Sequence, residues 1–475
     1  MLDEAAIQEL APVFRGELLR PGDGGYDAAR RVWNGMIDRR PALIARCTGV
    51  ADVVHIVDFA REHDLLVAVR GGGHNVAGNA VCDDGVVIDL SQQKGVWVDA
   101  AARTARAQPG VTWGLFDRET QAYGLATTGG LVSTTGIAGL TLGGGLGWLA
   151  RMHGTACDNL LAAEVVTAAG EIVRAHASEN TDLFWGLRGG GGNFGVATSF
   201  EYRLHPVGPQ VLAGAVFHPG ENAPEVLRFF RDFVETAPDE LTTIAVILTA
   251  PPAPFLPAEA HGKLAVALAV CYAGDLEQGE RVLEPLRAFG RPLADVVAPM
   301  PYTALQSMFD AGYPPGISNY WKSNYVNDLS DDAIDTVVEY AARMSSPLAS
   351  CYFEHLGGAI SREGDQTAFG HRDFTFDFAI LAGWDDAGET DEHIGWAREF
   401  WEAMRPFSSD AVYVNNLGAE GEDRVKAAYA PERYERLVAL KEKYDPGNLF
   451  RLNQNISPSG QPLHGRRYTA TTSGL

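Results

Sequence analysis

The feature that most constrains this chain is the gathering of glycines into three clusters between residues 71 and 195. The first is Gly71–Gly73 and the third is Gly189–Gly192; between them, the stretch from Thr127 to Gly147 alone holds eight glycines. Such a density disfavours a regular helix and favours backbone that lies directly against a large body, where side chains would not fit. Tight turns explain any one cluster. Three clusters in succession predict loops around one ligand, because backbone N–H groups can bind a pyrophosphate without a cation.

The common nucleotide-binding and hydrolase motifs do not account for these loops. Residues Gly190–Gly195 match G-x-G-x-x-G, but a dinucleotide fingerprint needs a strand before it and a helix after it. Here Asp182–Leu187 has a helical pattern and Val196–Phe200 an extended one, which is the reverse order. The sequence contains no P-loop, no H-E-x-x-H and no G-x-S-x-G. A Rossmann domain is therefore not expected.

Length and charge restrict the class of protein further. A chain of 475 residues is too long for one core, so two domains are expected. The boundary is placed near residue 207, where glycine clusters give way to aromatic-rich strands and amphipathic helices. The formal net charge of −23 disfavours nucleic acids and acidic membrane surfaces as partners. Neither a nucleic acid nor a membrane is therefore expected as a partner.

Cysteine usage and the first residues indicate the compartment. The five cysteines include no C-x-x-C pair, so neither a metal site nor a disulfide framework is expected. The acidic start Met1–Glu4 lacks the basic and apolar regions of a signal peptide. No apolar run reaches the length of a membrane span. The predicted location is the cytoplasm.

Local patterns predict short strands in the first part and mixed elements in the second. Helical spacing or strand-like alternation marks each segment. The expected helices are Val53–His63, Trp113–Tyr123, Asp182–Leu187 and Asp331–Met344. The expected strands are Leu65–Val69, Val86–Leu90, Val96–Asp99, Thr104–Gln108, Ala162–Thr167, Glu171–Ala175, Val196–Leu204 and Cys351–His355. The turn Ala168-Ala169-Gly170 predicts that the two strands beside it form a hairpin.

Four motifs, in this order along the chain, resemble one flavoprotein family. They are Arg70-Gly-Gly-Gly-His-Asn-Val-Ala-Gly78, Gly139–Trp148 followed by Asp158-Asn159-Leu160, Leu183–Gly195, and Tyr444–Ile456. Together they are similar to the berberine-bridge-enzyme-like branch of the vanillyl-alcohol-oxidase superfamily, and most of all to its bacterial members. The resemblance spans most of the chain.

The resemblance implies an α+β fold of two parts. A two-subdomain, PCMH-type FAD-binding domain is expected over residues 1–206, and a substrate domain, an antiparallel sheet backed by helices, over 207–425. Residues 426–458 are expected to return to the FAD domain, and 459–475 to form a flexible tail.

The resemblance further implies FAD as cofactor, bonded covalently through His74. Some members carry a second link from a cysteine, but Val132 stands at that place here, so a single bond is expected. A second anchor at Cys157 is the less favoured alternative. The residues expected to bind the cofactor are Arg70, Gly71, Gly72, Gly73, His74, Asn75, Gly78, Thr128, Gly129, Ser133, Thr134, Gly136, Ile137, Gly139, Leu140, Gly143, Gly144, Gly147, Trp148, Asp158, Asn159, Asn453 and Asn455.

The chemistry that the resemblance implies is removal of a hydride from a small-molecule substrate, at a C–H next to an alcohol or amine, onto the flavin. Reoxidation by O₂ to give H₂O₂ is expected, and Ile137, at the family position that controls oxygen access, is compatible with it. Two alternatives stay open: a tailoring oxidase or dehydrogenase of an aromatic natural product, and a flavin-binding protein without turnover. The aromatic residues Tyr313, Tyr320, Trp321 and Tyr325 suit a flat or apolar substrate.

Three residues of the second part are candidates for catalysis. Lys322, in a motif whose lysine points at the flavin ring in the family, would hydrogen-bond near the ring or lower the pKa of a tyrosine. Tyr352 shares one face of its expected strand with Glu354, so both would reach the cleft. Asn416 stands where the family often has a basic tyrosine, and its amide orients a substrate without taking a proton. On a regular strand over 412–416, Tyr413 would face away from Asn416.

Overall fold

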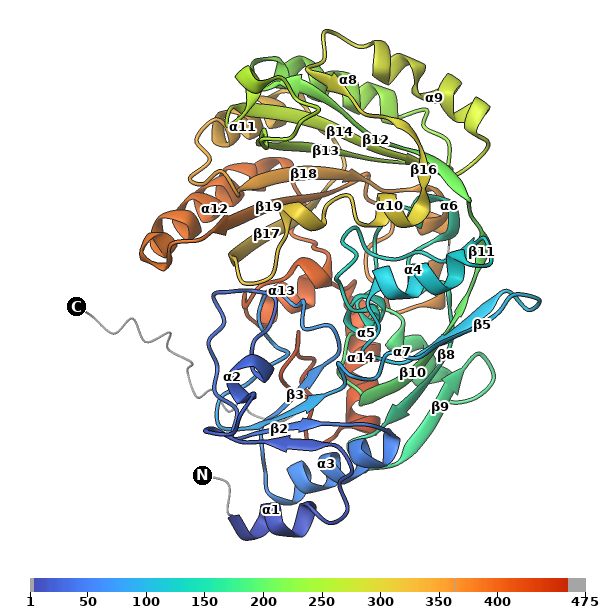
Figure 1. Ribbon diagram of the computed structural model, residues 1–475, viewed down its shortest axis with the longest axis vertical. Helices are drawn as coiled ribbons and strands as arrows, with labels where there is room; N and C mark the ends of the chain where they lie inside the picture. Colours follow the sequence, from blue (N-terminus) through green and yellow to red (C-terminus); the bar gives the residue numbers. More distant parts are fainter. Residues whose placement is uncertain (1–3, 363, 460–475) are drawn as a thin grey trace.

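The computed structural model describes residues 4–362 and 364–459, and the chain forms two layered parts joined along one side (Figure 1). The first part lies at the bottom of the view and contains the N-terminal helices α1 (Glu4–Leu10) and α2 (Tyr26–Ala29). The second part lies at the top and is built on one large sheet. Among these described residues, no helix is long and apolar enough to cross a membrane. Of the expected tail 459–475, only Ser459 belongs to the described residues.

A small sheet and a helix begin the first part. Its strand order is β1-β2-β4-β3, with β2, β4 and β3 parallel and β1 antiparallel. The strands are β1 (Glu17–Leu19), β2 (Leu43–Arg46), β3 (Val67–Arg70) and β4 (Val86–Asp89), and the helix is α3 (Val50–Glu62). Strands β2 and β4 are almost wholly buried, as parallel strands covered on both faces are. The expected helix at Val53–His63 and the expected strand before the first glycine cluster are confirmed.

A second, antiparallel sheet completes the first part. Its order is β5-β6-β10-β8-β9. The strands are β5 (Val96–Asp99), β6 (Thr104–Ala107), β8 (Leu160–Val166), β9 (Ile172–His176) and β10 (Val196–Arg203). The helices are α4 (Trp113–Gln121), α5 (Ile137–Leu142), α6 (Ala150–His153) and α7 (Thr181–Leu187), and β7 (Leu125–Ala126) pairs with β11 (His205–Pro206). The predicted hairpin of β8 and β9 is confirmed, as is the helix-then-strand order that excluded a Rossmann motif.

The second part is one antiparallel sheet with helices on its outer face (Figure 1). The strand order is β15-β12-β14-β13-β18-β19-β17, with β16 also paired to β12. The strands are β12 (Gln210–Pro219), β13 (Leu241–Thr249), β14 (Leu264–Tyr272), β15 (Ala294–Asp295), β16 (Ala298–Pro301), β17 (Ser318–Val326), β18 (Ser350–His355) and β19 (Phe376–Trp384). The helices of the outer face are α8 (Ala223–Val234), α9 (Leu276–Ala288), α11 (Asp331–Ala341) and α12 (Thr390–Met404), whereas α10 (Tyr302–Gln306) packs against α4 of the first part.

Alternation along these strands divides the sheet into two faces. Side chains such as Leu268, Phe353 and Phe378 pack against α8, α11 and α12 in one large apolar core. On each strand, the residues that alternate with these core residues point to the other face of the sheet, which is turned toward the first part. That inner face is therefore the side of the second part that can form a site with the glycine loops.

The C-terminal segment returns to the first part. Helix α14 (Pro431–Tyr444) packs beside α7, and α13 (Glu422–Ala427) precedes it (Figure 1). Apolar residues from the predicted segment 426–458, such as Leu437 and Ile456, share one core with the second sheet of the first part, and so does the earlier Val412. The buried ammonium of Lys441 pairs with Asp445 and donates to the carbonyls of Asn193 and Phe450. These bonds fix the segment beside the third glycine cluster.

Candidate active site

One cavity of about 1200 Å³ lies between the two parts and is lined by both. All three glycine clusters contribute to its wall, through Gly71–Gly73, through Gly136, Gly139 and Gly143, and through Gly191 and Gly192. The three clusters therefore line one common space, as the prediction of loops around one ligand requires. The opposite wall is the inner face of the large sheet, and the C-terminal segment adds Asn453 and Gln454.

The glycine loops need their glycines for two different reasons. A Cβ on Gly72 would lie 2.5 Å from the Cα of Gly136, so two loops touch backbone to backbone there. At Gly139 and Gly192 the reverse holds, because such a Cβ would have no described atom within 4 Å apart from its chain neighbours and, for Gly139, the backbone of its own helix. The first pair thus joins the loops, and the other two positions leave bare backbone facing open cavity. The buried Oδ1 of Asn453, on the same wall, has no hydrogen-bond partner among the described residues.

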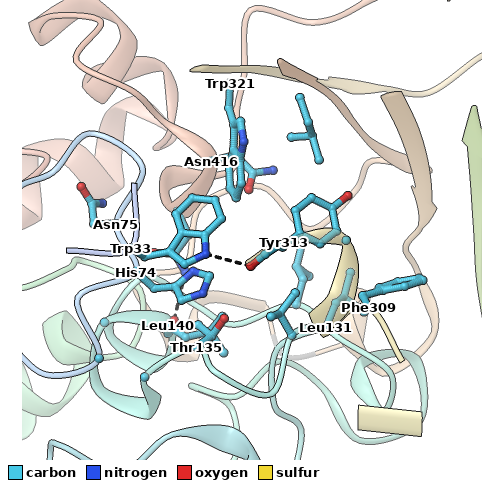
Figure 2. A pocket seen from close by; sticks show the side chains of 18 of the residues that line it. Trp33, His74, Asn75, Leu131, Thr135, Leu140, Phe309, Tyr313, Trp321 and Asn416 are labelled. Carbon is cyan, nitrogen blue, oxygen red and sulfur yellow. Dashed lines mark hydrogen bonds between the residues drawn. The ribbon is translucent and has the colours of Figure 1, made fainter. Parts of the chain in front are cut away.

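His74 lies at the junction of the two walls (Figure 2). Its ring stacks on Trp33, with centroids 4.5 Å apart and an interplanar angle of 18°. Its Nε2 is 3.2 Å from the Thr134 hydroxyl. The indole N–H of Trp33 in turn donates to the carbonyl oxygen of Tyr313, at 3.0 Å. Burial lowers the pKa of His74 to about 4, so the imidazole is neutral near pH 7, with a nitrogen lone pair available.

A polar cluster stands on the sheet side of the cavity. The Tyr352 hydroxyl donates to Asp377 Oδ2 at 3.1 Å, and the Asn416 amide donates to the same oxygen at 2.9 Å. The Ser323 hydroxyl donates to Asp377 Oδ1 at 3.0 Å. Burial raises the pKa of Asp377 to about 6 and holds the pKa of Tyr352 well above its usual range. At neutral pH the cluster therefore contains a carboxylate that receives three hydrogen bonds, with a protonated phenol between it and the cavity.

Glu354 adds a second buried carboxyl to this wall. It stands directly opposite Asp377 in the pairing of β18 with β19, and it lines the cavity. Burial, and then the charge of Asp377, raise the pKa of Glu354 to about 8. Glu354 therefore carries its proton near pH 7, whereas Asp377 has lost its own. The expectation that Tyr352 and Glu354 share the cavity face of one strand is confirmed.

The structure corrects the expectation for Lys322. On β17 the residues beside it, Trp321 and Ser323, belong to the inner face, so Lys322 points to the opposite, helix-covered face. There its ammonium pairs with Glu420 and lies 4.6 Å from the centroid of the Trp401 ring of α12. Lys322 does not line the cavity. The sequence could not show this, because the register of β17 decides which of two adjacent residues faces inward.

The segment 412–416 is also different from the expected strand. Tyr413 ends an extended stretch, and Val414–Asn416 form a 3₁₀ helix, so Tyr413, Asn415 and Asn416 all line the cavity. The Tyr413 hydroxyl accepts hydrogen bonds from the backbone N–H groups of Gly145 and Leu146, at 2.9 and 3.2 Å. Tyr413 is thus a residue that holds the second glycine loop, and Asn416 is the one that reaches the polar cluster.

The other predicted residues divide into two groups. Those that line the cavity are Gly71, Gly72, Gly73, His74, Asn75, Gly136, Gly139, Leu140, Gly143, Asn453, Tyr352 and Asn416. Those that lie outside its wall are Arg70, Gly78, Thr128, Gly129, Ser133, Thr134, Ile137, Gly144, Gly147, Trp148, Asp158, Asn159, Asn455 and Lys322. Of the four aromatic residues noted above, Tyr313 and Trp321 line the cavity, whereas Tyr320 and Tyr325 do not.

Several residues of the second group stabilise the glycine loops through contacts on the side away from the cavity. The guanidinium of Arg70 is paired with buried Asp89, with Nε 3.1 Å from Oδ1. The Thr128 hydroxyl donates to the carbonyl of Gly154. The backbone N–H and the hydroxyl of Ser133 both donate to the carboxylate of Asp310 in the second part. These bonds fix the backbone that forms the wall.

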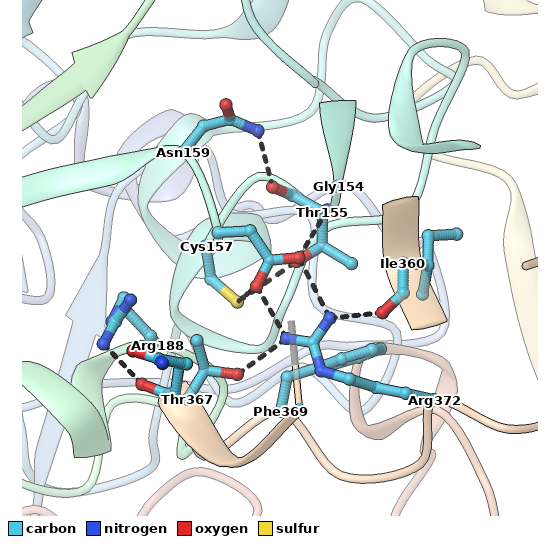
Figure 3. A network of polar contacts seen from close by, with 12 residues as sticks. Gly154, Thr155, Cys157, Asn159, Arg188, Ile360, Thr367, Phe369 and Arg372 are labelled. Atoms are coloured by element: carbon cyan, nitrogen blue, oxygen red, sulfur yellow. Dashed lines mark hydrogen bonds and ion pairs between the residues drawn. The ribbon is translucent and has the colours of Figure 1, made fainter. Parts of the chain in front are cut away.

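Asp158 belongs to a buried network that joins the two parts through Arg372; Figure 3 shows Thr155, Cys157 and Arg372 of this network. The Asp158 carboxylate pairs with Arg372 at 2.6 Å, and the side chains of both residues are at most 4% exposed. It also accepts from the backbone and hydroxyl of Thr155, each at 2.8 Å. Cys157 lies in the same network, fully buried, with Sγ 3.2 Å from the Thr155 hydroxyl. Cys157 is not part of the cavity wall, whereas Val132 is.

Sequence reasoning missed two residues of this site. Asp377 was identifiable as the one acidic residue in the otherwise apolar run Phe376–Trp384, since a carboxylate in a buried strand costs stability unless it is paired or functional. Trp33 gave no local signal, because its contact with His74 joins segments about 40 residues apart in the chain.

Comparison with known proteins now places the chain in a class. Residues 41–176 match the FAD binding domain family model, and residues 412–457 match the model named Berberine and berberine like. The (R)-6-hydroxynicotine oxidase of Paenarthrobacter nicotinovorans is 32% identical over 94% of this chain and 98% of its own length. An FAD-linked oxidoreductase of Dictyostelium discoideum is 31% identical over 95% of this chain and 97% of its own length.

Solved structures agree with these matches. The 6-hydroxy-D-nicotine oxidase of Arthrobacter nicotinovorans superposes with a TM-score of 0.85 at 30% identity, covering 94% of this chain and 98% of that one. The BBE-like 1 protein of Physcomitrella patens gives a TM-score of 0.84 at 25% identity, covering 94% and 97%. Fold and cavity together define a flavoenzyme with an FAD-binding domain. The chain belongs to the berberine-bridge-enzyme-like family of FAD-linked oxidoreductases.

Proposed function

We propose that this enzyme oxidises a C–H bond next to an alcohol or amine, with FAD bonded to His74 and O₂ as the final electron acceptor. Residues 1–206 and 426–458 would hold the cofactor, and 207–425 the substrate. When bound, the flavin supplies the hydride acceptor. The observation that carries the proposal is one cavity with glycine loops and His74 on one wall and the Tyr352–Asp377 pair on the other.

The residues present fit a dinucleotide cofactor. Bare backbone at Gly139 and Gly192 gives a pyrophosphate room to approach N–H groups, and the unpartnered Asn453 Oδ1 is free to accept a hydrogen bond from the ligand. The neutral imidazole of His74 has the lone pair that a covalent bond to a flavin methyl group requires. Because Cys157 lies outside the cavity wall and Val132 lies in it, a single covalent bond is proposed.

Proton removal is assigned to Tyr352 and Asp377 together. The substrate O–H or N–H gives its proton to the Tyr352 oxygen while the phenolic proton passes to Asp377 Oδ2, 3.1 Å away. The phenol cannot ionise by itself, because its pKa lies well above the usual range; the carboxylate behind it is the acceptor. Asn416 donates to the same carboxylate and fixes its orientation, which explains how an asparagine can stand at this position.

Mass spectrometry of the purified protein tests the cofactor. After denaturation and digestion, the peptide that contains His74 should carry the mass of FAD. His74→Ala should lose the covalent flavin, and the exposed His63→Ala should keep it. Flavin released entirely by acid, with His74 unmodified, would show that the bond does not exist.

A second assay tests turnover. Members of a panel of alcohols and amines should bleach the flavin absorbance without oxygen and release H₂O₂ with oxygen. Flavin that is bound but reduced by no member of the panel would favour the alternative of a binding protein without turnover.

A further inference from the structure

The inner face of the large sheet is polar near Tyr352 and becomes apolar toward β12. Strand pairing aligns residues of neighbouring strands in rows across the sheet. One row runs from Tyr352 on β18 to Val246 on β13, Ala267 on β14 and Phe217 on β12, and the four strands follow one another in this order in Figure 1. All four side chains line the same cavity. The row therefore leads from the proposed proton acceptor directly into an apolar region.

Small side chains make this region hollow. In the next row Ala215 of β12 pairs with Ala269 of β14, which pairs with Ile244 of β13. Ala215, Ala267 and Ala269 form what we name the alanine trough. All three line the cavity, and the lining residues paired beside them on β13 and β12 include the larger Ile244, Val246 and Phe217. Methyl side chains beside these larger ones leave space that a bulkier residue would fill.

The loop after β13 and the side chain of Phe217 enclose the alanine trough. Residues 250–253 of the loop after β13 line the cavity, and Phe255 of the same loop packs on Phe217 with ring centroids 5.4 Å apart. His261 Nε2 lies 3.2 Å from the carbonyl oxygens of Ala253 and Leu256, which holds the loop in its folded form. The trough is thus bounded by the sheet below, this loop above and Phe217 at its far end.

The length of the trough follows from strand spacing. Neighbouring strands lie about 4.8 Å apart, so Ala267 is about 10 Å and Phe217 about 14 Å from Tyr352 along the row. Beyond Tyr352, the two sheet rows offer only apolar side chains to the cavity over this distance. A sugar placed here would leave its hydroxyl groups without partners, which is costly.

We propose that the substrate is an amphipathic molecule with a large apolar body. Its alcohol or amine carbon lies beside Tyr352, and an alkyl or polycyclic portion about 10 Å long lies over the alanine trough, toward Phe217. The inference rests on the proposed function for the position of the reacting carbon. It narrows the substrate class to hydrophobic alcohols or amines.

Binding of a graded ligand series to the full-length holoprotein tests this inference. The probes are 4-n-alkylbenzyl alcohols from methyl to octyl, with Kd measured by titration calorimetry. In the unchanged protein, Kd should fall about two- to fourfold per methylene, the range expected for partial to full burial of each group, until the chain meets Phe217. A Kd that does not depend on chain length would overturn the inference.

Two substitutions of opposite effect act as mutual controls. Ala267→Phe fills the trough, so the ratio of methyl to octyl Kd should drop at least tenfold. Phe217→Ala removes the end wall, so the series should continue to improve at the longest chains. Because the readout is a ratio within one preparation, partial loss of folded protein does not change it. If Ala267→Phe does not fold, Ala267→Leu replaces it. Unchanged ratios in both kinds of variant would refute the trough as the binding surface.

The result of this binding test can be distinguished from the result of the test of the proposed oxidase reaction. Length-dependent binding that is lost in Ala267→Phe, without any release of H₂O₂, supports the trough and contradicts the oxidase reaction. Release of H₂O₂ with no dependence on chain length supports the reaction and contradicts the trough.

Discussion

Asp377 is the residue whose replacement tests the proton transfer most directly. In Asp377→Asn, one of the oxygens that receive hydrogen bonds from Ser323, Tyr352 and Asn416 becomes an NH₂ group, and no acceptor remains for the Tyr352 proton. Loss of a positioned base typically costs 10²–10⁴ in rate. We expect kcat/KM to fall by that factor, about 3–5 kcal/mol in the barrier.

The pH dependence supplies the second readout. In the proposed relay the carboxylate is the active form, and the pKa of Asp377 is raised to about 6, so activity should rise with pH through about 6. One unit lower, at pH 5, about a tenth of Asp377 is ionised and kcat/KM should be about tenfold below its plateau. Initial rates from pH 5 to 9 measure this, with the flavin content of each preparation as the reference.

Glu354→Gln is the matched control, because it converts a carboxyl to an amide on the same wall. Glu354 is still protonated at pH 6, since its pKa is raised to about 8; the rise through pH 6 should therefore persist, and any change near pH 8 should disappear. The proposed relay is refuted if Asp377→Asn keeps more than a tenth of kcat/KM, or if its rates still rise through pH 6 as in the unchanged enzyme.

Three further substitutions test the loops and the buried network. Asp158→Asn removes the carboxylate of a buried ion pair with Arg372, so the free energy of unfolding in urea should fall by about 3–5 kcal/mol; a loss under 1 kcal/mol would show that the pair contributes little. Cys157→Ser should keep covalent flavin on the His74 peptide, and flavin loss in this variant would revive the second anchor. Gly72→Ala, whose Cβ would lie 2.5 Å from the backbone of Gly136, should abolish flavin incorporation, whereas Gly49→Ala, in open space, should not; normal flavin content in Gly72→Ala would contradict the tight loop contact.

Local signals were enough to predict the parts of the fold that depend on neighbouring residues. The hairpin of β8 and β9 was predictable because Ala168-Ala169-Gly170 separates two strand-like runs. The common space between the glycine clusters was predictable because glycine density reports close approach of backbone. Both the hairpin turn and the glycine density are visible in residues that are close together in the sequence.

Features that depend on register or on distant contacts were not predictable in this way. Lys322 and Trp321 are adjacent, and only the pairing of β17 with β19 decides that the tryptophan faces inward. The strand expected at 412–416 is a 3₁₀ turn, because Tyr413 binds the loop at Gly145 and Leu146, which lies far away in sequence. The role of Asp377 required knowledge that Tyr352 and Asn416 converge on it.

The return of the C-terminal segment has a consequence for biosynthesis. The apolar core beneath the second and third glycine clusters contains residues from Ala105 to Ile456. About nine tenths of its residues have therefore been synthesised before Leu437, Leu440 and Ile456 leave the ribosome. Leu437 and Leu440 of α14 are wholly or largely buried there, and a nascent chain without them leaves that core open to water. We therefore expect cofactor uptake to wait for the synthesis of α14, and a chain truncated before α14 to accumulate as colourless protein, even though all three glycine clusters had already been made.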